Sequence, residues 1–143
     1  MCDIRIASSK AMFAESFVQL GLIPGDGGAW FLPRAVGFSN ASLMALTGDP
    51  VKAEEALRIG LVSMVVEPEE LLTKAQGIAA RIAANPPHAV RLTKQLLRGS
   101  ETSSLNEMLD KSAAFQAVCH AEADHHEAIA AFFEKRSGDY RKS

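Results

Sequence analysis

A turn rich in glycine and proline, residues 20–28, limits the folds open to this chain more than any other segment. It reads Leu-Gly-Leu-Ile-Pro-Gly-Asp-Gly-Gly and is followed by a helix-forming stretch. Gly25, Gly27 and Gly28 let the backbone approach a ligand closely and present N–H groups at a helix start, which suits an anion. The alternative is a tight turn with close packing. The glycine spacing is not that of a dinucleotide-binding fingerprint.

Residues 3–7 and 61–66 have the alternation or the β-branched content typical of strands, and residues 12–18 are a second strand or a turn. Helical periodicity dominates elsewhere, so we expect a mainly helical α/β chain with strands confined to roughly residues 1–20 and 61–66. The N-terminal strands have no evident partner in the chain, and isolated strands expose unpaired edges. We therefore expect Met1 to be an internal start, a truncation point or a misplaced gene boundary.

Capping residues predict where the helices begin and end. Helices are expected to end in a left-handed residue at four glycines: Gly37, Gly48, Gly60 and Gly99. Helices are expected to begin at Ala53, at Pro68, at Asn85-Pro86 with Asn85 as N-cap, and at the capping boxes Ser104-x-x-Glu107 and Asp124-x-x-Glu127.

Composition excludes several classes of protein. The chain has 143 residues, enough to bury a core, and its net charge of -2 gives no general attraction to nucleic acid or to anionic membranes. Two cysteines, Cys2 and Cys119, are too few and too far apart for a disulfide framework or a zinc site. No apolar run reaches membrane-spanning length, and we expect a cytoplasmic protein without nucleic-acid or membrane partners.

The segment from Phe13 to Arg34 resembles the signature of the enoyl-CoA hydratase/isomerase (crotonase) family. Blocks at residues 46–62 and 128–136 resemble later parts of that family in the same order. The resemblance implies an α/β, mostly helical fold that forms the C-terminal half of a ClpP/crotonase spiral. Residues 1–66 would be the remainder of the core, and residues 67–143 a helical region that assembles homo-oligomers, trimers or hexamers.

The resemblance also implies chemistry on acyl-CoA thioesters, in which two backbone N–H groups stabilise an enolate and carboxylates move protons. Both N–H donors and the first catalytic glutamate would lie upstream of Met1. The expected function is a truncated hydratase or isomerase of fatty acid metabolism that is inactive alone. The alternative is a non-catalytic oligomerisation or weakly CoA-binding remnant. No cofactor is expected, because the coenzyme A thioester is the substrate.

Two acidic residues near the signature are candidate catalytic groups. The family positions that carry a carboxylate in hydratases and in some isomerases are held here by Phe17 and Gly25. Asp26 and Glu15 are the nearby acids. Asp26 is alternatively a helix N-terminal aspartate that caps free N–H groups, and Glu15 a solvated or salt-bridged residue.

The C-terminal segment offers a candidate contact for coenzyme A. Phe132 and Lys135 resemble the family residues that touch the adenine and its 3′-phosphate. Alternatively, Phe132 belongs to the apolar face of its helix and Lys135 is a helix-end cation. Trp30 and Phe31 are core residues or part of an acyl pocket.

The remaining histidines and cysteine carry no predicted chemistry. His120, His125 and His126 do not converge with a recognised ligand set, so no metal site is predicted. Cys119 is expected to be a small buried apolar residue.

Overall fold

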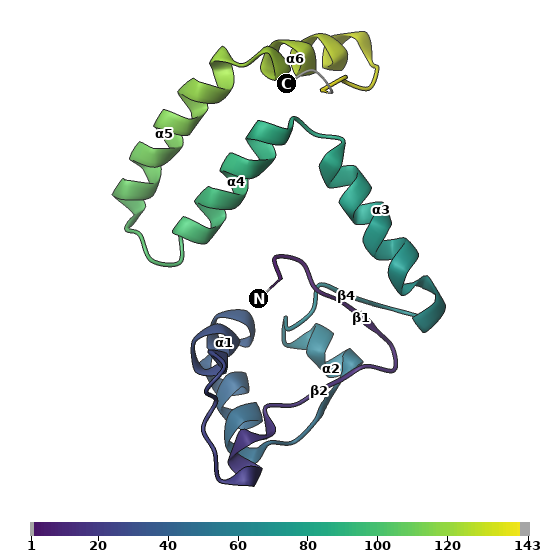
Figure 1. Cartoon of the computed structure of the whole chain (residues 1–143), viewed down its shortest axis with the longest axis vertical. Coiled ribbons are helices and arrows are strands. Elements are labelled where there is room, and N and C mark those ends of the chain that lie inside the picture. Colours follow the sequence, from purple (N-terminus) through teal and green to yellow (C-terminus); the bar gives the residue numbers. More distant parts are fainter. Residues whose placement is uncertain (1, 141–143) are drawn as a thin grey trace. The chain divides into compact units, whose positions relative to one another are not determined.

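The structure, a computed structural model, describes residues 2–140 of the chain (Figure 1). The elements in order are β1 (Ile6–Ser8), β2 (Met12–Phe13), the 3-10 helix η1 (Ser16–Leu20), α1 (Gly28–Thr47), β3 (Val51–Lys52), α2 (Ala53–Arg58), β4 (Met64–Val66), the 3-10 helix η2 (Pro68–Glu70), α3 (Leu71–Ala83), α4 (Pro87–Gly99), α5 (Leu105–Ala121) and α6 (Ala123–Glu134). The expectation of a mainly helical α/β chain is confirmed. The chain forms two compact units, residues 1–76 and 77–143, whose boundary lies inside α3. The division at residue 66 drawn from the sequence stays a prediction.

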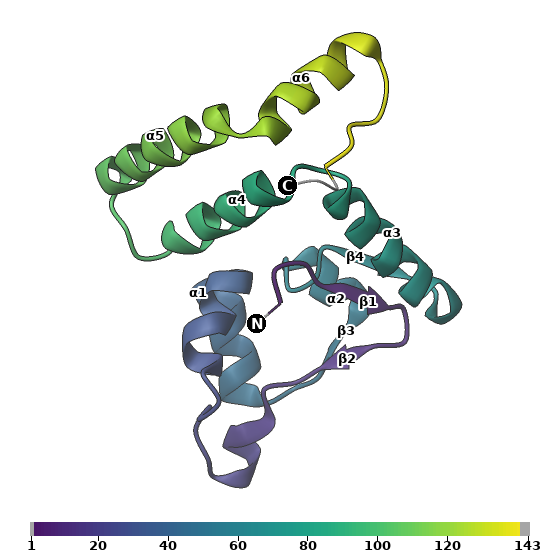
Figure 2. The same ribbon diagram turned by 45° about the horizontal axis from the view of Figure 1, so that its top comes forward.

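The strands of the first unit pair with each other. β1 runs parallel to β4, with Ile6 opposite Met64, and β2 runs antiparallel to β3 (Figure 2). Next to β1, the Arg5 side chain donates to the carbonyl of Leu61. The prediction that the N-terminal strands lack a partner is therefore wrong. It failed because β3 has two residues, too few for alternation to show, and lies outside the expected strand regions.

Residues 12–18, expected to be a strand or a turn, contain a two-residue strand followed by a helical turn. β2 ends at Phe13, and η1 begins at Ser16. Gly21 closes η1 in the left-handed conformation, with φ 69°, and its N–H donates to the Val18 carbonyl over 3.0 Å. The segment therefore turns back toward α1 instead of continuing as a strand, and η1 and α1 lie in contact.

Small residues form the core of the first unit. Ala7 of β1, Ala53 and Ala56 of α2, and Val62 are buried together. Because alanines occupy these positions, α2 can approach the strands closely. Larger residues such as Phe13 and Leu61 pack against this core but are only partly buried. Within residues 2–140 no large side chain is fully buried, and Trp30 and Phe31 are 49% and 40% exposed. The prediction that these two aromatic residues belong to the core is wrong for the described part of the chain.

Three of the four glycines expected to end helices have a positive φ where a helical segment ends, and Gly99 does not. Gly48 ends α1 in the left-handed conformation, with φ 70°, and Gly60 also has a positive φ of 79° after α2. Gly37 has a positive φ of 78° with ψ 158°, and this non-helical residue divides α1 into two helical segments at a kink, so a helical segment does end there. Gly99 is the last residue of α4 and is followed by Ser100 in a right-handed conformation. The expectation for Gly99 was wrong, because a run of helix formers does not show whether the next turn continues.

The second unit contains α4, α5 and α6, and its capping residues are partly those predicted. The capping box before α5 is confirmed: Ser104 N–H donates to Glu107 Oε2 over 2.7 Å, and Glu107 N–H donates to Ser104 Oγ over 3.3 Å. The predicted start of α4 is shifted by one residue, because Pro86 is the N-cap and Pro87 opens the helix. Asn85 instead donates its amide to the last carbonyls of α3.

The start of α6 also differs from the prediction. Glu122 is its N-cap and makes no side-chain cap hydrogen bond, so Asp124 and Glu127 do not form a capping box. Asp124 is buried, and Glu127 pairs with Arg136 at the other end of the helix. Within residues 2–140, no helix combines the length and apolar character needed to cross a membrane.

Candidate functional site

Glu15 and the start of α1 come into direct contact, although the sequence separates them by thirteen positions. A Cβ placed on Gly28 would lie 2.2 Å from Glu15 Oε1 and 3.1 Å from Asp26 Oδ1. The carboxyl group of Glu15 therefore rests against the backbone of Gly28, which only glycine allows. We refer to Glu15, Asp26, Gly27 and Gly28 as the Glu15 site; all four are residues that the sequence picked out.

The electrostatics of the Glu15 site centre on an unpartnered carboxyl oxygen. Glu15 Oε1 is shielded from solvent and has no hydrogen-bond partner among the described residues. Burial raises the pKa of Glu15 above its ordinary value, and the negative charge of Asp26 raises it further. Glu15 as a whole is half-buried, so the expectation of a solvated residue fails only for Oε1. A carboxyl group whose ionisation is disfavoured in this way is suited to holding and releasing a proton.

Asp26 has the local role that the alternative interpretation described. Its Oδ1 accepts the N–H of Gly28 over 2.9 Å, while the side chain stays exposed. This hydrogen bond takes up an N–H group at the first residue of α1, which is otherwise without a helical partner. Asp26 thus fixes the start of α1 and supplies the negative charge that acts on Glu15.

The glycines of the turn have different roles. Gly27 is the N-cap of α1 with φ 92°, and a Cβ on it would come within 3.2 Å of the Phe31 ring. A Cβ placed on Gly25 would meet nothing nearer than the Ile23 carbonyl oxygen, 3.9 Å away. Further along α1, the Arg34 guanidinium stacks over the exposed Trp30 ring, 3.3 Å from its centroid.

The proposed coenzyme A residues lie at the end of α6 and are accessible. Phe132 is 78% exposed and meets Phe133 edge to face, with ring centroids 5.7 Å apart. Lys135 is the C-cap of α6 and has φ 55°. The alternative that Phe132 belongs to the apolar face of its helix stays open, because an exposed ring fits both interpretations.

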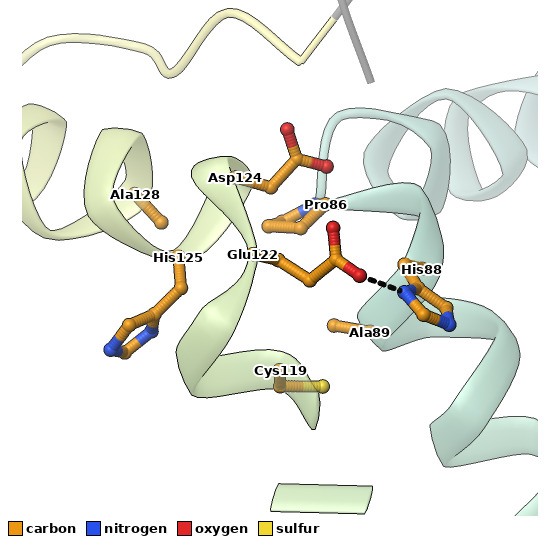
Figure 3. Close-up of a pocket in the computed structure, with 8 residues that line it drawn as sticks. All are labelled: Pro86, His88, Ala89, Cys119, Glu122, Asp124, His125 and Ala128. Carbon is orange, nitrogen blue, oxygen red and sulfur yellow. Dashed lines mark hydrogen bonds and ion pairs between the residues drawn. The ribbon is translucent and has the colours of Figure 1, made fainter. Parts of the chain in front are cut away.

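A small cavity of about 80 Å³ lies between the start of α4 and the junction of α5 with α6 (Figure 3). Its lining includes Cys119, Glu122 and Asp124, and across it His88 Nδ1 lies 3.0 Å from Glu122 Oε1. Cys119 is half-buried here, less than expected. The sequence analysis missed this group, because His88 and Glu122 are 34 positions apart and neither belongs to a motif.

The histidines at the α5–α6 junction form a pair that the sequence did not indicate. His120 Nδ1 lies 3.0 Å from His125 Nε2, and their rings meet edge to face. The break between the two helices at Glu122 brings them together. Within residues 2–140, no three side chains of His, Cys, Asp or Glu adopt an arrangement suited to a metal ion.

Comparison with known proteins identifies the family. The model of the enoyl-CoA hydratase/isomerase family matches residues 1–143. A short-chain-enoyl-CoA hydratase of Clostridium acetobutylicum is 46% identical over 136 residues, covering 94% of this chain and 52% of the relative. A crotonyl-CoA hydratase of Syntrophomonas wolfei is 41% identical and covers 97% of this chain and 54% of the relative. The chain thus spans about half the length of the curated relatives it matches.

The structural comparison agrees. The crystal structure of an enoyl-CoA hydratase from Bacillus anthracis superposes with a TM-score of 0.96 at 36% identity, covering 99% of this chain and 55% of that one. The expected partial crotonase fold, α/β and mostly helical, is therefore confirmed. The chain belongs to the enoyl-CoA hydratase/isomerase family.

Proposed function

We propose that this chain takes part in the hydration or isomerisation of acyl-CoA thioesters, with Glu15 as the group that moves the proton. The observation that carries the proposal is the Glu15 carboxyl group, shielded and unpartnered against Gly28 within the family's signature segment. Relatives that act as short-chain-enoyl-CoA and crotonyl-CoA hydratases support the substrate class.

The chemistry makes a specific demand on this carboxyl group. Hydration of a conjugated thioester adds the oxygen of water to the β-carbon and a proton to the α-carbon. A carboxylate accepts a proton from the water, or a carboxylic acid donates one to the carbon, and both work best when the pKa lies near the working pH. The raised pKa of Glu15 moves it in that direction. Because Phe17 and Gly25 hold the two family positions, Glu15 replaces the missing carboxylate in this proposal.

We further propose that residues 1–143 tested by themselves show no measurable hydration of crotonyl-CoA. The resemblance implies that both oxyanion N–H donors lie in segments outside these residues. Removing one such donor costs a factor of about 10²–10³ in rate. An assay that follows loss of the conjugated thioester absorbance tests this, and turnover that persists through rigorous purification contradicts it.

A chimera tests the role of Glu15 itself. Residues 1–143 would replace the matching half of the C. acetobutylicum hydratase, which is 46% identical. We expect activity in the chimera and a loss of about 10²–10⁴ in kcat on Glu15→Gln, as general acid–base groups typically contribute. Glu54→Gln, at an exposed position of α2, is the matched control. An unchanged kcat in the Glu15→Gln chimera would refute the proposed role.

The second candidate function is weak binding of coenzyme A without catalysis, at Phe132 and Lys135. The exposure of Phe132 and the position of Lys135 at the end of α6 favour it. The ring would pack against the adenine and the ammonium would face the 3′-phosphate. Calorimetric titration with coenzyme A tests this function. Unchanged binding after Lys135→Ala would remove Lys135 from the site.

The proposal includes a homo-oligomer, trimeric or hexameric, located in the cytoplasm and acting in fatty acid metabolism. Exposed apolar side chains on several helices support assembly, among them Leu43 and Leu46 on α1 and Leu105 and Leu109 on α5. Sedimentation velocity at micromolar concentration tests it, and a stable monomer would contradict it.

A further inference from the structure

Lys135 has a backbone conformation that its residue type disfavours. Its φ of 55° makes it the single non-glycine residue with a positive φ among residues 2–140. The left-handed conformation brings the Cβ close to the following carbonyl oxygen, and helices usually place glycine at this point. A lysine held in this conformation indicates that the surrounding structure enforces the turn.

Arg136 makes the contacts that hold the chain in this turn. Its Nη1 and Nη2 donate to Glu127 Oε1 and Oε2 over 2.5 and 3.1 Å, and its Nε donates to Glu134 Oε2 over 2.6 Å. Such a two-pronged contact fixes the orientation of the guanidinium as well as its position. Glu127 Oε1 also accepts the backbone N–H of Asp139 over 3.0 Å, which ties the chain beyond Arg136 to α6.

Backbone hydrogen bonds hold the same turn after α6. Lys135 N–H donates to the Phe132 carbonyl over 3.3 Å, and Arg136 N–H donates to the Ala131 carbonyl over 3.0 Å. Ala131 is buried, so this end of α6 is anchored in the unit. The Arg136 side chain reaches Glu127 on α6 only because the chain reverses at Lys135.

We propose that Glu127 and Arg136 form a positioning clamp that holds Lys135 in its left-handed turn and so presents its ammonium group, beside the Phe132 ring, to a phosphate-bearing nucleotide. The proposal rests on the proposed coenzyme A contact at Lys135. Glu127 and Arg136 act through Lys135 and do not touch the ligand. Breaking the clamp therefore lowers the preference for a 3′-phosphate while leaving every cation in place.

Glu127→Gln on the full chain tests the clamp, with coenzyme A and dephospho-coenzyme A as probes in calorimetric titrations at low salt, where exposed ion contacts are strongest. In the wild type we expect coenzyme A to bind up to about fivefold more tightly than dephospho-coenzyme A. Glu127→Gln removes a negative charge, so simple electrostatics would increase this preference. Loss of the clamp should instead reduce the preference for coenzyme A over dephospho-coenzyme A toward the value measured for Lys135→Ala. The two explanations therefore predict opposite signs.

The matched control is Glu55→Gln, which makes the same charge change and breaks a similar exposed pair, Glu55 with Arg58 at 2.5 Å. We expect the control to keep the wild-type preference. The three-bond HN–Hα coupling and Cα shift of Lys135 report its φ, and Glu127→Gln should shift them to right-handed values.

If Glu127→Gln keeps or increases the preference for coenzyme A over dephospho-coenzyme A, the clamp is overturned and the coenzyme A contact is not. The clamp is also overturned if this preference falls while Lys135 stays in its left-handed conformation. A wild type that binds both probes equally overturns the coenzyme A contact itself, and the clamp as a device for it.

Discussion

Gly27 and Gly28 are adjacent, yet replacing each by alanine should have opposite effects on stability. Gly27 has φ 92°, so Gly27→Ala should cost about 1–2 kcal/mol. Its Cβ would also come within 3.2 Å of the Phe31 ring, which adds to the cost. Gly28 is the first residue of α1 and has no positive φ, so Gly28→Ala should gain about 0.5–1 kcal/mol by reducing the conformational entropy of the unfolded chain.

The new Cβ at residue 28 meets the end of a long, flexible side chain instead of backbone. It would lie 2.2 Å from Glu15 Oε1, so Glu15 must swing away into solvent. That movement also removes the burial that disfavours its ionisation. We therefore expect Gly28→Ala to be more stable than Gly27→Ala by about 1.5–3 kcal/mol at neutral pH, and to lose the Glu15 site.

Urea unfolding measures the difference, and Trp30 on α1, the single tryptophan, reports it directly. With a typical slope of about 1–3 kcal/mol per molar urea, the midpoints should differ by about 0.5–3 M. Equal midpoints, or a Gly28→Ala protein less stable than Gly27→Ala, would refute the reasoning. Backbone strain would then not be specific to Gly27, or the Glu15 side chain would not move freely away from residue 28.

Three further outcomes follow from the charged and capping groups. Because the pKa of Glu15 is raised, the folded state loses stability as pH rises through that pKa. Glu15→Gln should therefore be more stable than the wild type at pH 7 and equally stable at pH 3. Urea midpoints in the reverse order would contradict this. Arg136 lowers the pKa of Glu127 to about 2, so the ion pair stabilises the folded state above the ordinary pKa of 4.5 and this stabilisation is lost as pH falls toward 2. Glu127→Gln should therefore make stability depend less on pH between 4.5 and 2. An unchanged acid unfolding curve would argue against the pair. Ser104→Ala should cost about 1 kcal/mol, whereas the exposed neighbour Ser103→Ala should cost almost nothing in the same urea assay, and equal costs would remove the cap.

Structural features that depend on a few neighbouring residues were predicted well from the sequence. The capping box at Ser104 and the left-handed end of α1 at Gly48 each depend on a few neighbouring residues, and both appear in the structure. The turn before α1 was also placed correctly, because four glycines and a proline in nine residues leave few alternatives.

Features that depend on distant contacts were not predictable. Burial of Glu15 requires that the chain return to Gly28, and nothing next to Glu15 in the sequence shows this. The pairing of Arg136 with Glu127 requires a left-handed turn at Lys135, a residue that rarely adopts one. The strand β3 is fixed by its partner β2 and not by its own two residues.

The central claim is that the fold holds the Glu15 carboxyl group with a raised pKa against Gly28. Titration of the glutamate carboxyl carbons by ¹³C NMR measures it, with Glu15 assigned by its loss in Glu15→Gln. Asp26→Asn keeps an acceptor for the Gly28 N–H and removes only the charge. We predict a midpoint above 4.5 in the wild type and a lower one in Asp26→Asn. A wild-type midpoint at or below 4.5 that does not respond to Asp26→Asn would contradict the account.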